Sequence, residues 1–184
     1  MKIFSNKRNK IMVLGIFIVV ILLLGIKLYF KTNSLEEEEA ITESKPLNLN
    51  WLSYDEGLLK AEKENKYILI DFYTDSCSWC KKLDKEVYSN EEVKKILLDK
   101  FITIRVDANS QNKVEENGQE IAEGKLATVY QVTGYPTTWF LESNHSRVAP
   151  LPGYVTTEQF IPVLNYIGEG WYKSISFKEY MEKI

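Results

Sequence analysis

The two cysteines of the chain both lie in the tetrapeptide Cys77-Ser78-Trp79-Cys80. Two thiols separated by two residues can close into a small disulfide and reopen by exchange with another thiol or disulfide. The tetrapeptide follows a near-continuous apolar run, Tyr67 to Tyr73, and precedes residues with helical spacing. At the start of a helix, unpaired backbone N–H groups stabilise a thiolate and lower the pKa of a cysteine. The cysteine pattern therefore indicates a redox centre.

The residues after the tetrapeptide predict a helix that presents the two thiols differently. Cys80, Leu83 and Val87 are separated by three and four positions, so they share one helix face. This pattern turns Cys80 toward the core and leaves Cys77 at the helix tip. We therefore expect Cys77 to be the thiol that another protein can reach.

Asp71 lies in the apolar run, six positions before Cys77. Burial disfavours the charged form of a carboxyl group, so its pKa is expected to rise toward the range useful for proton transfer. We expect Asp71 to accept the proton of the inward-facing Cys80 thiol. The alternative is a structural role at the strand end, in which Asp71 pairs with a lysine.

The first thirty residues predict a membrane anchor. Residues 1–10 contain four basic residues, and residues 11–30 form an apolar run. A helix of about twenty residues is about 30 Å long, enough to cross the hydrocarbon core of a bilayer. The basic residues favour a cytoplasmic N-terminus, which places the remainder in the periplasm or on the outer face of the cell. A cleaved signal peptide is the alternative, although no small-x-small cleavage site follows the run.

The charge of the chain is unevenly distributed. The net charge is −3, but residues 1–31 contain six basic residues and no acidic one, which leaves −9 on the remainder. An acidic remainder argues against a nucleic-acid partner. Residues 31–50, with the Glu36–Glu39 run, are expected to form a solvated tether. Residues 51–169 have the size of one domain, and the aromatic residues in 170–184 predict an extension that packs back on it.

Beyond the tether, strands are predicted to alternate with helices, followed by a hairpin and a last helix. This order indicates an α/β domain with a central mixed β-sheet flanked by helices on both faces. The expected elements are a helix capped by Ser53, a strand over 67–73, the helix of the cysteines, a helix over 91–99, a strand over 101–106, an irregular polar stretch over 108–125, a helix over 126–132, hairpin strands over 137–141 and 147–151, and a helix over 156–167.

Three segments, in order, resemble the thioredoxin superfamily. Residues Ile68 to Lys82 resemble its active-site strand and helix, Thr133 to Thr138 resemble its Gly-x-Pro-Thr loop, and Gly153 matches its glycine before the last helix. The resemblance covers about residues 51–169. It is strongest to exported, membrane-attached members such as SoxW-type thioredoxins and the C-terminal domain of the DsbD reductase, and it implies the thioredoxin-like fold.

The resemblance implies a role for each site residue. Cys77 would be the nucleophile, Cys80 would resolve the mixed disulfide, and the bond before Pro136 would be cis. The backbone of Tyr135 would pair with the substrate chain like an added strand. Trp79 departs from the Gly-Pro that ordinary thioredoxins have between their cysteines, and it is either a substrate contact or a residue packed on the surface.

The expected function is a membrane-anchored, extracytoplasmic thiol–disulfide oxidoreductase that reduces disulfides of exported proteins. Disulfide oxidation or isomerisation is one alternative, and a redox-inactive or redox-sensing client-binding module is another. A membrane thiol donor would have to recharge the reductant, and the bilayer would bind residues 11–30. No cofactor is implied. Two cysteines and one histidine cannot form a standard four-ligand zinc site without added carboxylates, and His145 is expected to be a surface residue of the predicted hairpin turn.

Overall fold

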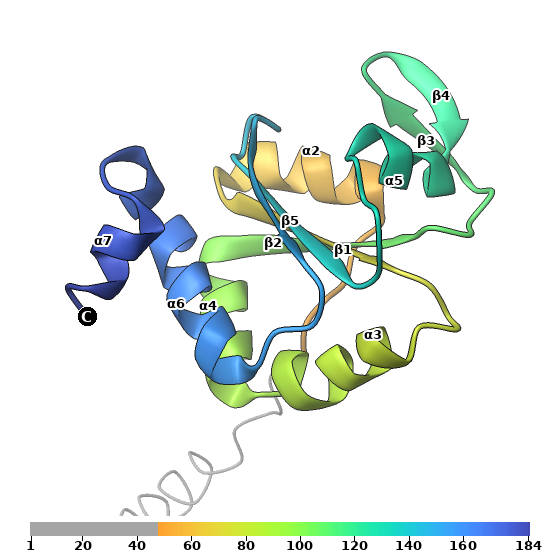
Figure 1. Cartoon of the computed structure of the whole chain (residues 1–184). Coiled ribbons are helices and arrows are strands. Elements are labelled where there is room, and N and C mark those ends of the chain that lie inside the picture. The colour runs from red at the N-terminus through yellow and green to blue at the C-terminus, as the bar shows by residue number, and fades with distance from the viewer. Residues whose placement is uncertain (1–47) are drawn as a thin grey trace, which may run out of the picture. The chain divides into compact units, whose positions relative to one another are not determined.

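The computed structural model describes residues 48–184 (Figure 1). The predicted cytoplasmic segment 1–10, the predicted anchor 11–30 and all but the end of the predicted tether 31–50 lie outside this part. Within residues 48–184, no helix has both the length and the apolar character needed to span a bilayer.

The domain is built on a four-stranded mixed sheet with the strand order β2-β1-β5-β6. β1 (Tyr67–Tyr73) lies parallel to β2 (Phe101–Asp107), and it pairs antiparallel with β5 (Thr137–Leu141) on its other side. β6 (Arg147–Pro152) pairs antiparallel with β5 and forms the edge. The predicted hairpin is thus β5 and β6. The mixed sheet predicted from the order of elements is confirmed.

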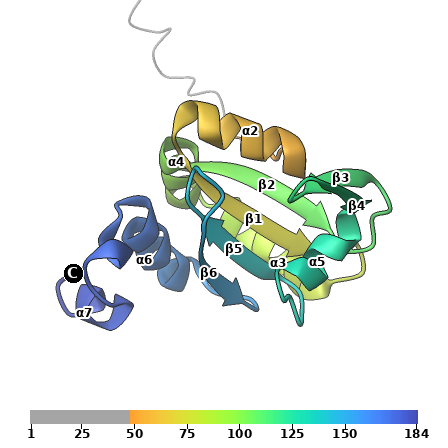
Figure 2. The ribbon, with the colours of Figure 1, turned by 90° about the horizontal axis from the view of Figure 1, so that it is seen from above.

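Helices cover both faces of this sheet (Figures 1 and 2). Alternate residues of a strand point to opposite faces. Ile68, Ile70 and Phe72 of β1 accordingly belong to one core cluster, and Leu69 belongs to a second. Fully burying each such side chain contributes about 1.5–3 kcal/mol to folding, which holds β1 at the centre.

The first cluster includes residues of α2 (Tyr54–Glu64) and α5 (Leu126–Val129). The second includes residues of α3 (Ser78–Leu83), the π-helical segment η1 (Asp84–Tyr88), α4 (Glu91–Lys100) and α6 (Thr157–Gly168).

The polar stretch predicted to be irregular, residues 108–125, contains a β-hairpin instead. β3 (Lys113–Glu116) and β4 (Gln119–Ala122) pair antiparallel, and the short 3-10 segment η2 (Glu123–Lys125) leads into α5. The turn residues Asn117 and Gly118 both have positive φ, as a tight hairpin turn requires. The hairpin is attached to α2 because the Tyr54 hydroxyl donates a 2.6 Å hydrogen bond to Glu116.

The C-terminal extension contains a short 3-10 segment, η3 (Trp171–Lys173), and α7 (Phe177–Met181). The ring of Tyr166 on α6 lies 5.2 Å from Phe177 and 5.4 Å from Tyr180, measured between ring centroids. The Tyr166 hydroxyl donates to the carbonyl of Ile175 at 2.6 Å. These contacts hold the extension against α6.

Candidate active site

The two cysteines form a disulfide at the start of α3, with their Cα atoms 5.3 Å apart. After β1 ends, a turn brings the backbone N–H of Cys77 to the carbonyl of Thr74 at 3.1 Å. Cys77 then serves as the N-cap of α3, and its Sγ accepts a 3.0 Å hydrogen bond from the N–H of Cys80. Cys77 is partly exposed, whereas Cys80 is 4% exposed. A protein approaching from solvent would therefore meet Cys77.

The loop of Pro136 lies at the same edge of the sheet as the disulfide. The Tyr135–Pro136 peptide bond is cis, and β5 begins at the next residue. Thr137 pairs with Phe72, next to the carboxyl end of β1, from which the chain turns into the cysteine segment. The carbonyl of Pro136 accepts a 2.8 Å hydrogen bond from the N–H of Gly153, which follows β6. The loops after β1, before β5 and after β6 therefore meet at one end of the domain.

Trp79 is 54% exposed, yet its ring also packs against a neighbour. Its centroid lies 5.5 Å from that of Tyr154, in the loop between β6 and α6. Pro136 itself is buried, and Tyr135 is half-buried against the first core cluster.

Asp71 is buried on the face of β1 that carries α3 and α4, two positions after Leu69. Only 1% of the residue is exposed. Its Oδ2 accepts hydrogen bonds from Arg105 on β2, at 3.0 Å from Nε and 2.9 Å from Nη2. Within residues 48–184, Oδ1 has no hydrogen-bond partner. The structure thus places an arginine where the alternative interpretation of Asp71 expected a lysine.

Burial raises the pKa of Asp71 to about 6 from its ordinary 3.8, and the positive charge of Arg105 opposes this rise. A carboxyl group with such a pKa can take up and release a proton near neutral pH. The nearby Tyr88 hydroxyl, which shares a 3.3 Å hydrogen bond with Thr138, stays protonated, because burial raises its pKa and the charge of Asp71 adds to the rise.

Arg105 is a site residue that the sequence did not reveal. It lies opposite Asp71 in the parallel pairing of β1 and β2. Its Nη2 also pairs with Asp84, so the guanidinium bridges a buried carboxyl and a partly exposed one. The guanidinium lies 4.5 Å from the ring centroid of Trp51 and 4.9 Å from that of Tyr73. The one available signal was a single charged residue inside the apolar run 101–106.

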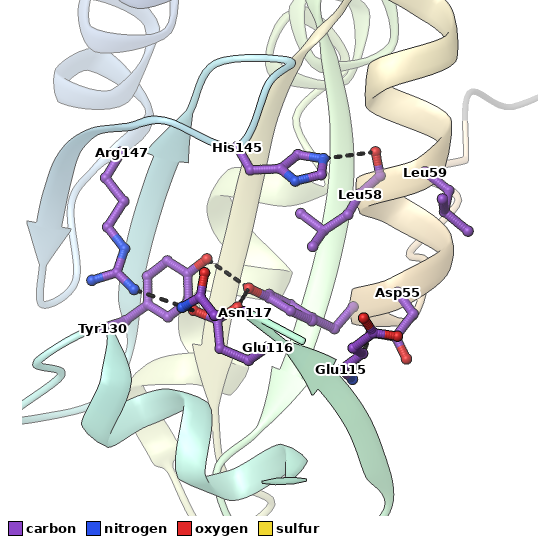
Figure 3. A pocket seen from close by; sticks show the side chains of 10 residues that line it. Asp55, Leu58, Leu59, Glu115, Glu116, Asn117, Tyr130, His145 and Arg147 are labelled. Carbon is purple, nitrogen blue, oxygen red and sulfur yellow. Dashed lines mark hydrogen bonds and ion pairs between the residues drawn. The ribbon is translucent and has the colours of Figure 1, made fainter. Parts of the chain in front are cut away.

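His145 lies away from the cysteines. It is exposed in the turn between β5 and β6, and its Nε2 is 3.3 Å from the carbonyl of Leu58. It lines a pocket of about 700 Å³. Figure 3 shows it there with Glu116 and Arg147 among the other lining residues. No group of three or more potential metal ligands occurs within residues 48–184.

Comparison with known proteins identifies the family. Over 116 residues the chain is 29% identical to the disulfide bond reductase DsbH of Chlamydia pneumoniae, and this match covers 60% of the chain and 69% of DsbH. It is 25% identical over 120 residues to the thiol:disulfide interchange protein DsbD of Photorhabdus laumondii, which covers 64% of the chain but 19% of DsbD. A solved thioredoxin-fold protein from Helicobacter pylori shares 26% identity with a TM-score of 0.57, covering 65% of this chain and 84% of that one.

Residues 54–168 match the family described as a Thioredoxin-like domain, and this span is more than half of the chain. The resemblance seen in the cysteine segment, the Pro136 loop and Gly153 is thus confirmed. The chain belongs to the thioredoxin-like family. The relatives that it matches include thiol–disulfide oxidoreductases.

Proposed function

We propose that this protein is a membrane-anchored thiol–disulfide oxidoreductase that works outside the cytoplasm and reduces disulfides of exported proteins. The observation that carries the proposal is the disulfide at the start of α3, with Cys77 partly exposed and Cys80 buried. The apolar run 11–30 supports the anchor and the location, since it is long enough to cross a bilayer.

The reaction is two successive thiol–disulfide exchanges. In the reduced protein, the thiolate of Cys77 attacks one sulfur of the client disulfide, a Cys77–client bond forms, and the second client sulfur leaves as a thiolate that takes up a proton. The thiolate of Cys80 then attacks the Sγ of Cys77. The Cys77–Cys80 bond forms, and the first client sulfur leaves and takes up a proton. Two electrons pass from the cysteine pair to the client.

Asp71 is proposed to take the proton of Cys80 before the second exchange. It faces the side of β1 that α3 covers, and its pKa near 6 leaves it mostly ionised, and so able to accept a proton, at pH 7. Arg105 would hold the ionised carboxyl through two hydrogen bonds. Its second contact, with Asp84, would connect the buried carboxyl with the protein surface.

The reducing direction is supported by the name of the relative in Chlamydia pneumoniae, a disulfide bond reductase. A reductant outside the cytoplasm needs a source of electrons, so a thiol donor at the membrane would reduce the Cys77–Cys80 disulfide by the same exchange. The backbone of Tyr135, beside Pro136, is proposed to pair with the client chain.

Reduction of insulin by the full chain, with dithiothreitol as the electron source, tests the proposal. We expect turnover by the wild-type protein and none by Cys77→Ser. Pre-reduced Cys80→Ser, mixed with insulin in the absence of dithiothreitol, is expected to accumulate a mixed disulfide, because Cys77 can attack but no second thiol of the protein releases it. Absence of turnover by the wild-type protein would favour a client-binding module instead.

A further inference from the structure

Trp79 is the large apolar side chain closest in sequence to both cysteines, and more than half of it is exposed. Exposing an indole in the active-site tetrapeptide forgoes the free energy that its burial would provide. Within residues 48–184, no hydrogen bond involves its ring nitrogen. Its place, two residues after the proposed nucleophile, puts it where a client chain must pass.

The ring of Trp79 packs on a residue of another segment, and hydrogen bonds hold that residue and its loop in place. Tyr154 packs against it, with centroids 5.5 Å apart, and the Tyr154 hydroxyl donates a 2.6 Å hydrogen bond to Oε2 of Glu86. Thr157, at the start of α6, donates to the carbonyl of Glu86 at 3.1 Å. The loop that carries Tyr154 is thereby fixed to η1, so the two rings form one preorganised surface.

The polar groups of this surface are already paired with one another. The Nζ of Lys82 lies 5.1 Å from the ring centroid of Trp79 and 4.8 Å from that of Tyr154. Its charge is met by Glu86, whose Oε2 lies 3.8 Å away. A charged client side chain would have to compete with these contacts, whereas an apolar one would cover the remaining face of Trp79 at no such cost.

The surface continues into the loop of Pro136. Gly153, directly before Tyr154, donates to the carbonyl of Pro136 at 2.8 Å. A client strand that paired with the backbone of Tyr135 would therefore run past Tyr154 toward the disulfide.

We infer that Trp79 and Tyr154, with Lys82 and Glu86 holding them, form a specificity surface that receives a large apolar or aromatic side chain next to the client cysteine. This inference rests on the proposed function, because it assigns the client class of the same exchange reaction. The occupant is a disulfide-bonded peptide segment with a residue such as phenylalanine or leucine beside its cysteine.

The test compares the reduction of disulfide-linked peptides that differ at one position. Two peptides carry either phenylalanine or alanine beside the cysteine, and the reduced full chain supplies the electrons. The ratio of the two second-order rate constants is the readout, because an altered reactivity of the cysteines changes both rates alike. We expect the wild-type protein to prefer the phenylalanine peptide by about fivefold or more, as an aromatic contact contributes to binding.

Trp79→Ala is expected to lower this ratio to about one, and Tyr154→Ala is expected to lower it in part. Trp171→Ala is the matched control, since Trp171 is also an exposed tryptophan, 40% exposed, but belongs to the C-terminal extension. Its ratio should equal that of the wild-type protein.

Equal rates for the two peptides, or an unchanged ratio in Trp79→Ala, would overturn the inference while leaving the proposed function intact. The small substrate hydroxyethyl disulfide, which has no side chain to recognise, separates the two claims. If the reduced wild-type protein reduced neither peptide nor hydroxyethyl disulfide, the proposed function would fail and the inference with it.

Discussion

The Asp71→Asn variant is expected to be more stable than the wild-type protein at pH 7.5, although it loses an ion pair. In the folded protein, burial raises the pKa of Asp71 to about 6 from its ordinary 3.8. Because one pKa unit corresponds to about 1.4 kcal/mol, the ionised carboxyl lowers the free energy of unfolding by about 3 kcal/mol above pH 6. The folded chain binds this proton more tightly than the unfolded chain does. The decrease in the free energy of unfolding is therefore complete above pH 6 and disappears as the pH falls toward 3.8.

The pKa of about 6 already includes the opposing charge of Arg105, so the figure of about 3 kcal/mol is a net one. Asparagine loses the two charge-assisted hydrogen bonds to the guanidinium, but Arg105 keeps its pairing with Asp84 and is not left as a buried, unpaired charge. We therefore expect a net stabilisation of about 1–3 kcal/mol at pH 7.5 and little or none at pH 4.

Denaturant unfolding of the oxidised full chain in mild detergent, followed by near-ultraviolet circular dichroism at pH 4 and pH 7.5, measures this difference. Asp75→Asn is the control, because Asp75 is an exposed carboxylate four positions along the chain. The reasoning would be refuted if Asp71→Asn were destabilised at pH 7.5, or if its stability difference were the same at both pH values.

Three further predictions concern the same domain. Asp71→Asn should slow the release of a trapped client by Cys80 more than the first attack, as rapid-quench measurements between pH 6 and 9 would detect; equal slowing of both steps would argue against Asp71 as the proton acceptor. Arg105→Met removes the charge that lowers the pKa of Asp71, so the acid limb of the pH–rate profile should move up by about one unit or more. An unmoved limb would argue against this coupling. Gly57→Ala should lower the stability by about 1–3 kcal/mol in thermal unfolding, because a Cβ at Gly57 would overlap Ile104, and a wild-type Tm would contradict the tight packing of α2 on β2.

The sheet and its faces could be predicted because the apolar pattern of this chain is strong where the core is. β1 is buried on both faces and has a near-continuous apolar sequence. In the helix of the cysteines, the spacing of Cys80 and Leu83 indicates which face is buried. The predicted helix over 126–132 ends earlier, at Val129, since short helices lack the capping signals that fix a boundary.

The β3–β4 hairpin was missed for a physical reason. Its strands are mostly charged or polar, and a single apolar pair, Val114 opposite Ile121, faces the core. Two-residue alternation is therefore too weak to indicate strands there. The Asn117-Gly118 pair was the available signal for a tight turn, and long-range contacts with Tyr54 supply the rest of the stability.

Arg105 could not be assigned to the site from sequence because the register of two parallel strands is set by tertiary packing. The same chain segment would place Thr103 or Asp107 opposite Asp71 after a shift of two residues. Only the observed register, Asp71 opposite Arg105, joins the buried carboxyl to a guanidinium. Asp84, one turn after Cys80, joins the site through the same guanidinium, a contact that also depends on tertiary packing.

Equilibration of the full chain with glutathione buffers of defined ratio tests the central claim most directly. The fraction of Cys77–Cys80 in the disulfide form, counted by alkylation of free thiols, should follow a single two-electron transition with a potential near −270 mV, as in a reducing thioredoxin. A potential near −120 mV would mean that the pair oxidises its clients. Cysteines that stayed in one state across all buffers would contradict the exchange mechanism altogether.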